Sequence, residues 1–193
     1  MNTSWIIGVQ HVWFGISIFL LLLLLVSRTL FFREAILAKQ FSRRHLVLFI
    51  VIFSLMALCG SYWNVSAGGG IMNFRAVGIM LGGFVGGPIV GIIVGCIAGI
   101  HRALFFDTDA AFIHGGLSIL QGIAAGYLAN PLKSHHHNLW SWSFFYAGIL
   151  EILFWLFFAF FTWPEAIAHP NDFFDLWLPI IITNTIAVSL FYM

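Results

Sequence analysis

Residues 82–88 read GGFVGGP, and this stretch decides how the middle of the chain folds. Proline lacks the amide hydrogen that a helix interior needs, disfavours helical geometry in the residue before it, and suits the first turn of a new helix. We therefore expect one short helix to end near Gly86 and a second helix to begin at Pro88. The two helices would form a broken hairpin over residues 73–102, with arms of about 13 residues that are each roughly 20 Å long.

Glycines recur every four residues along both arms of this expected hairpin. A spacing of four places small residues on one face of a helix, where another helix can approach closely. We expect tight packing of the hairpin through Gly82, Gly83, Gly86, Gly87, Pro88, Gly91, Gly95 and Gly99.

The rest of the chain is as apolar as the hairpin. Of its 193 residues, 61% are hydrophobic and only 8% are charged, whereas a soluble domain averages about 25% charged residues. This composition excludes a soluble enzyme and a disordered regulator, and the net charge of +1 argues against binding to nucleic acid. The chain is therefore an integral membrane protein.

Five stretches approach the roughly 20 apolar residues that a membrane helix needs. The sequence thus predicts an all-α membrane domain over residues 1–193, with five transmembrane helices in addition to the hairpin. The expected spans are about 5–27, 46–63, 112–130, 142–163 and 174–193. The last span runs to the end of the sequence, so we expect a cytoplasmic output module to follow it in a longer protein.

The positions of Lys and Arg predict the orientation in the membrane. Five of the eight cations lie in the loop 28–45, which should be cytoplasmic by the positive-inside rule. If residues 73–102 enter and return as a hairpin, Lys133 is cytoplasmic as well. The N-terminus is then expected outside and the C-terminus inside.

The ends of the hairpin carry the candidate ligand-binding residues. Arg75 precedes the first arm and Arg102 follows the second, so a hairpin brings both to the same outer side. Because guanidinium groups match carboxylate geometry, the pair predicts a clamp for a small anion. An alternative is that Arg102 reaches the membrane interface while Arg75 pairs with an aspartate of the segment 105–109. Other polar residues that we expect at this site are Asn73, His101, His114 and Ser118.

Three further polar features lie outside the expected anion site. Glu151 lies in mid-span and is either a coupling or proton site or a neutral, hydrogen-bonded glutamic acid. The run 183–185, Thr-Asn-Thr, is expected to join helices through hydrogen bonds, and a relay of motion towards the C-terminus is the alternative. The run His135–His137 lacks the ligand spacing of a metal site and is expected to be a solvated loop. We expect no catalytic residues, no metal and no cofactor.

Part of the sequence is similar to a known family. Residues 73–78, NFRAVG, and 82–102, GGFVGGPIVGIIVGCIAGIHR, closely resemble the five-transmembrane receptor region of LytS/YhcK-type bacterial sensors. That family carries Asn-x-Arg, then a Gly-Gly-Pro run and a closing Gly-x-His-Arg. Residues 183–191, TNTIAVSLF, are also similar to its last helix.

The resemblance implies a sensory input domain in the bacterial inner membrane, followed by a LytS-type histidine kinase or by a diguanylate cyclase. It also implies a homodimer. A pyruvate-sensing branch of the family recognises a small carboxylate, and the matching positions here are Arg75 and Arg102, with Asn73 and His101 beside them. The acidic and aromatic segment 105–109, FFDTD, departs from that branch and leaves the identity of the ligand open.

A transporter is the alternative. Helices that are interrupted by glycine and proline near mid-membrane also build substrate sites in transporters, so a substrate-binding membrane subunit would have a similar composition. Two observations separate these functions. A receptor should continue into a cytoplasmic signalling module, and only a transporter should accumulate its substrate inside vesicles.

Overall fold

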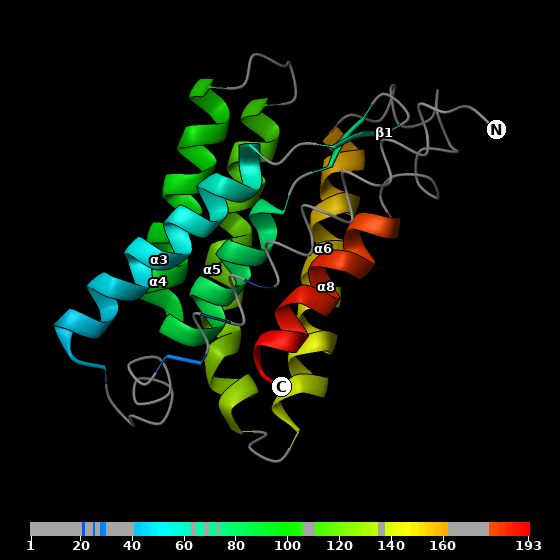
Figure 1. Ribbon diagram of the computed structural model, residues 1–193. Coiled ribbons are helices and arrows are strands. Elements are labelled where there is room, and N and C mark those ends of the chain that lie inside the picture. The colour runs from blue at the N-terminus through cyan, green and yellow to red at the C-terminus, as the bar shows by residue number, and fades with distance from the viewer. Residues whose placement is uncertain are drawn as a thin grey trace.

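The computed structural model of the protein describes residues 41–62, 65–67, 70–72, 74–105, 111–134, 138–161 and 178–193, and isolated positions between 21 and 29. Within these residues the chain forms five helices and one short antiparallel strand pair (Figure 1). The elements are α3 (Arg43–Tyr62), β1 (Val65–Ala67), β2 (Gly70–Met72), α4 (Arg75–Phe105), α5 (Ala111–Ser134), α6 (Leu139–Phe161) and α8 (Leu178–Phe191).

The helices have the character of membrane spans. Helices α3, α5 and α6 are long and apolar enough to cross a bilayer, α4 is equally apolar, and α8 is a shorter apolar helix. The predicted all-α membrane fold is therefore confirmed. The expected span at about 5–27 lies outside the described residues, except for isolated positions.

Helix α4 is broken at Gly87 and folds back on itself. Gly87 has φ 76° and ψ −168°, a conformation that side chains with a Cβ rarely adopt. A methyl group added to Gly91 would lie 2.9 Å from the Cα atom of Gly83, although these positions would be about 12 Å apart along one straight helix. The predicted hairpin is thus confirmed, with the break one residue before Pro88. Its second arm continues past Arg102 to Phe105.

The first arm of the hairpin packs against α3. A methyl group at Gly78 would lie 2.6 Å from the backbone nitrogen of Ala57, and one at Gly60 would lie 2.8 Å from the backbone nitrogen of Arg75. Backbones approach this closely only where side chains are absent from the contact. The start of α4 is therefore held directly against the end of α3.

The second arm packs antiparallel to α5. Gly91 faces the carbonyl oxygen of Gly122, and Gly99 faces that of Gly115, so that a methyl group at either glycine of the arm would overlap the oxygen. Gly95 faces the carbonyl oxygen of Ser118 between these two contacts. The four-residue spacing of the glycines thus forms the seam between α4 and α5.

The tip of the hairpin stops short of the end of α5. A methyl group at Gly126 would lie 2.6 Å from the Cα atom of Pro88, which places the tip about 12 Å before the last residue of α5. Lys133, near the end of α5, spans part of this gap, because its Nζ donates a hydrogen bond of 2.9 Å to the carbonyl oxygen of Val85. The amine compensates the partial negative charge at the end of the first arm.

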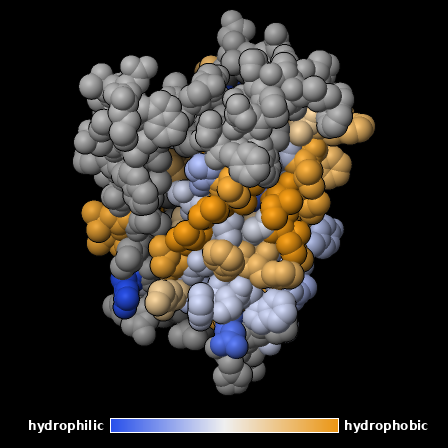
Figure 2. Space-filling view, turned by 90° about the vertical axis from the view of Figure 1, so that its right-hand side faces the viewer, coloured by the Kyte–Doolittle hydropathy of each residue, from blue (hydrophilic) through white to orange (hydrophobic). Residues whose placement is uncertain are grey.

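Helices α6 and α8 complete the described bundle and pack on each other and on α5 and α4. Figure 2 shows one face on which hydrophobic side chains gather. Exposed apolar residues recur every four positions on both helices, at Ile152, Leu156 and Phe160 on α6 and at Ile182, Ile186 and Leu190 on α8. Such stripes suit contact with lipid or with another apolar surface.

The two ends of the bundle differ in what they carry. The start of α3, the tip of the α4 hairpin, the end of α5 and the C-terminus lie towards one end, which is the lower end in Figure 1. The end of α3, β1, the end of α4 and the start of α8 lie towards the other. Arg43, Arg44 and Lys133 belong to the lower end, whereas Arg75 and Arg102, at the two ends of the hairpin, lie away from it.

Candidate functional site

The hairpin buries both of its terminal arginines. Arg75 is the first residue of α4 and is 2% exposed, and Arg102, near the end of the second arm, is 3% exposed. The two guanidinium groups are near enough to interact electrostatically. Because two buried like charges repel each other, this part of the protein favours the presence of an anion.

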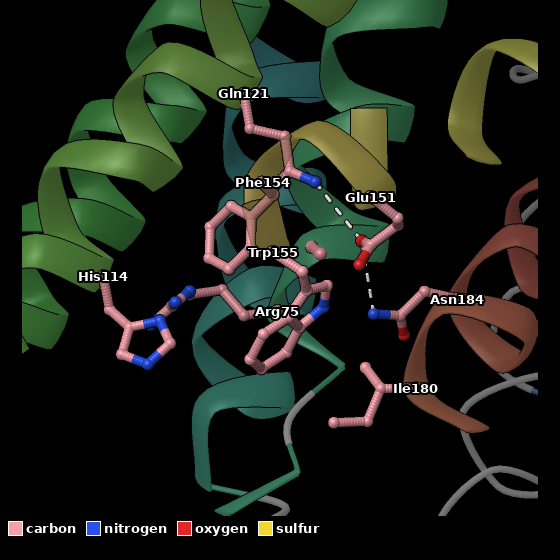
Figure 3. Close-up of a pocket in the computed structure, with 9 residues that line it drawn as sticks. Arg75, His114, Gln121, Glu151, Phe154, Trp155, Ile180 and Asn184 are labelled. Carbon is pink, nitrogen blue, oxygen red and sulfur yellow. Dashed lines mark hydrogen bonds between the residues drawn. The ribbon is translucent and has the colours of Figure 1, made fainter. Parts of the chain in front are cut away.

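A small cavity opens beside Arg75, between the first arm of α4 and helices α5, α6 and α8 (Figure 3). The space in it holds on the order of one water molecule. Charged, polar and aromatic side chains surround the space. The lining residues are Arg75, Ala76, His114, Gln121, Glu151, Phe154, Trp155, Ile180 and Asn184.

Glu151 joins three helices at this cavity. Its Oε1 accepts a hydrogen bond of 3.3 Å from Nε2 of Gln121 on α5 and another of 3.3 Å from Nδ2 of Asn184 on α8. Both bonds are visible in Figure 3. The carboxyl group itself comes from α6 and is 1% exposed. A buried acid is thereby held in place by amide donors from both neighbouring helices.

Several buried polar atoms of the lining residues have no hydrogen-bond partner among the described residues. They are Nη1 of Arg75, Nδ1 of His114, Oε1 of Gln121 and Oδ1 of Asn184. Arg75 also interacts electrostatically with Glu151, yet no hydrogen bond or ion pair joins these two described side chains. Unsatisfied buried polar groups are costly, so a cluster of them around one cavity indicates a site for a polar guest.

Two of the residues expected at the site line this cavity, namely Arg75 and His114. The imidazole of His114 stacks on Phe158 with ring centroids 4.1 Å apart, and Figure 3 shows the Arg75 side chain extending towards it. Arg102 is buried nearby, and its charge acts on both Arg75 and His114, but it is not part of the lining.

Two further expected residues, His101 and Ser118, do not line the cavity. His101 has Nε2 3.0 Å from the hydroxyl oxygen of Tyr62 and stacks on Phe105. Ser118 is buried, and its hydroxyl donates to the carbonyl oxygen of His114 in its own helix. Asn73, the acidic segment at 105–109 beyond Phe105, and His135–His137 lie outside the described residues.

Sequence reasoning did not place Gln121, Glu151 and Asn184 with the arginines. Glu151 and the run containing Asn184 were each considered separately, and Gln121 was not considered. A signal was available, because each is a strongly polar residue in the middle of an apolar span, and such residues usually face the interior of a bundle. Their meeting at one cavity depends on how the three helices are rotated about their axes.

Residues 29–193 match the protein family described as 5TMR of 5TMR-LYT. The chain belongs to this family. Membership makes it a sensory region of a multi-pass membrane receptor and not a catalytic domain. No match to the chain was found among curated proteins or among solved structures.

The described part of this 5TMR-LYT domain offers no metal centre, since no three of its His, Cys, Asp and Glu residues are grouped to hold an ion. Its cavity instead combines a buried guanidinium, a buried carboxyl group and two amides. Groups of this kind are able to hold a small polar molecule by hydrogen bonds and charge.

Proposed function

We propose that the chain is the ligand-sensing input domain of a LytS-type sensor histidine kinase and that it binds a small carboxylate beside Arg75 and Arg102. The observation that carries this proposal is the burial of Arg75 in the wall of a polar cavity, with the buried guanidinium of Arg102 near enough to act on it electrostatically. A buried guanidinium with an unused donor gains from an incoming anion, and Nη1 of Arg75 has no hydrogen-bond partner among the described residues.

The ligand would act on the C-terminal helix through Glu151. Any molecule bound in the cavity lies next to the hydrogen bonds that connect Glu151 to Gln121 on α5 and to Asn184 on α8. A ligand that fits better to one arrangement of these bonds shifts the balance between two packings of α8. Helix α8 then transmits the shift to a kinase module that follows it. A diguanylate cyclase module is the alternative output.

We propose that the domain lies in the inner membrane with its N-terminus outside and its C-terminus in the cytoplasm. Arg43, Arg44 and Lys133 belong to the same end of the bundle as the C-terminus (Figure 1). The positive-inside rule assigns that end to the cytoplasm. The hairpin termini with Arg75 and Arg102 then face outward, where an external ligand arrives.

Signalling by this domain is proposed to involve a homodimer. The apolar stripes on α6 and α8 are available for a second copy or for lipid. Light scattering of the purified chain, corrected for bound detergent, distinguishes a dimeric mass from a monomeric one. A monomer at all accessible concentrations would contradict this part of the proposal.

Thermal stabilisation of the purified chain by a panel of small carboxylates tests ligand binding. We expect at least one acid to raise the melting temperature of the wild type and to have no effect on Arg75→Gln or Arg102→Gln. Arg44→Gln is the matched control, because it removes the same charge from an exposed position outside the site. The absence of a shift from every acid, or an equal shift in all variants, would refute the anion site.

A substrate-binding subunit of a transporter is the second candidate function, because the break of α4 at Gly87 is also typical of transporter substrate sites. Reconstitution in vesicles separates the two functions. A receptor binds the radiolabelled acid in proportion to protein, whereas a transporter accumulates it in proportion to the internal volume.

A further inference from the structure

The cavity beside Arg75 has a second polar end that a simple carboxylate does not satisfy. Glu151 lies on the wall that α6 contributes, and the unpartnered oxygens Oε1 of Gln121 and Oδ1 of Asn184 belong to the same lining. All three groups accept hydrogen bonds. The cavity therefore has a donor end at Arg75 and an acceptor end around Glu151.

The orientation of the two amides follows from the chemistry of Glu151. The Oε1 atom of Glu151 accepts hydrogen bonds, and each amide presents its nitrogen to it. Nε2 of Gln121 and Nδ2 of Asn184 do so at 3.3 Å. Neither amide can turn its NH2 group towards another partner without breaking these bonds. Their oxygens consequently remain acceptors without a donor among the residues that the structure describes.

A guest that carried only a carboxylate would bring more acceptors into a space that already holds the oxygens of Glu151, Gln121 and Asn184. Buried acceptors that face one another without a donor between them are costly. A guest that also carries an ammonium group places N–H donors between its own carboxylate and Glu151. Such a molecule satisfies both ends of the cavity at once.

We propose that the ligand is a small zwitterion of the α-amino acid class, with its carboxylate on Arg75 and its ammonium group on Glu151. This inference rests on the proposed carboxylate site and specifies its ligand. Because the space holds on the order of one water molecule, the side chain of the amino acid must be very small, and lining side chains must move to admit it. Glycine and L-alanine fit this description best.

Two series of matched acids test the proposal with the purified wild-type chain. The first series has two carbons and consists of glycine, glycolate, glyoxylate and acetate. The second has three carbons and consists of L-alanine, L-lactate, pyruvate and propionate. Within each series the molecules differ only in the group next to the carboxylate. We expect the amino acid to bind most tightly in at least one series. Its affinity should exceed that of the plain acid of the same series, acetate or propionate, by about tenfold or more. Dissociation constants come from calorimetry or from the concentration dependence of the melting temperature.

The variant Glu151→Gln identifies the partner of the ammonium group. Loss of the carboxylate charge should weaken binding of the amino acid by about tenfold or more, while binding of the matching hydroxy acid changes much less. Equal weakening of both ligands would overturn the assignment to Glu151. If this variant does not fold, the wild-type ranking alone remains decisive.

The outcomes separate the two proposals. Tighter binding of a keto acid, hydroxy acid or plain acid than of the amino acid would overturn the zwitterion and leave the carboxylate site intact. No binding of any of the eight molecules would overturn both proposals.

Discussion

Asn184 on α8 donates a hydrogen bond from Nδ2 to Oε1 of Glu151 on α6, at 3.3 Å, and each of the two side chains is 1% exposed. This bond connects the C-terminal helix directly to the candidate ligand site. Since Gln121 of α5 donates to the same oxygen, the position of α8 depends on a junction that a bound ligand can disturb.

Asn184→Leu should lower the stability of the domain. The substitution removes one of the two amide donors to a buried acid, at a cost of roughly 1–3 kcal/mol. The melting temperature of the purified chain measures the effect. Ser189→Ala is the control in α8, because that hydroxyl only donates to the carbonyl oxygen of Ile186 in its own helix. Equal losses in the two variants would contradict the junction.

Gly91→Ala should destabilise the seam between α4 and α5. The added methyl group overlaps the carbonyl oxygen of Gly122, and overpacking of this kind costs roughly 1–3 kcal/mol. Gly116→Ala on α5 is the matched control, since nothing lies within 4 Å of its added methyl group. We expect that control to be neutral or slightly stabilising. Comparison of the two melting temperatures decides the point.

Gly87→Ala separates backbone strain from crowding. Nothing lies within 4 Å of a methyl group at Gly87, but φ is +76°. Any loss of stability must therefore come from the conformation that the break requires, at roughly 1–3 kcal/mol. An unchanged melting temperature would show that the hairpin turns without this backbone geometry.

Lys133→Met should loosen the tip of the hairpin. It leaves the carbonyl oxygen of Val85 without its donor, and it removes the ammonium group that lies 4.9 Å from the centre of the Phe41 ring. We expect a loss of roughly 1–3 kcal/mol and faster amide hydrogen exchange around the tip. Arg44→Met, at an exposed site, should leave both quantities unchanged.

The proposed orientation of the domain predicts which positions are accessible from the outer side of the membrane. In a chain with Cys59→Ser and Cys96→Ala, Tyr62→Cys at the end of α3 should react with a membrane-impermeant maleimide on intact cells. Ser134→Cys at the end of α5 should react only after permeabilisation. The opposite pattern would place the C-terminus outside.

Local backbone chemistry made the hairpin predictable from the sequence. A Gly-Gly-Pro run interrupts a helix whatever surrounds it, because proline removes an amide donor and glycine accepts a positive φ. The apolar spans were predictable for a similar reason, since composition alone decides whether a helix is stable in lipid. The positions of α3, α5, α6 and α8 accordingly lie close to the expected spans.

The composition of the candidate site depended on tertiary structure. Gln121 and Asn184 are 30 and 33 positions away from Glu151 in the sequence, and no local pattern shows which faces of three apolar helices meet. By itself, the sequence determined the membrane class, the break at Gly87 and the pairing of Arg75 with Arg102 at one end. Only the packing of the helices decided that Arg75 shares a cavity with Glu151, because that depends on which faces of α4, α5, α6 and α8 turn towards one another.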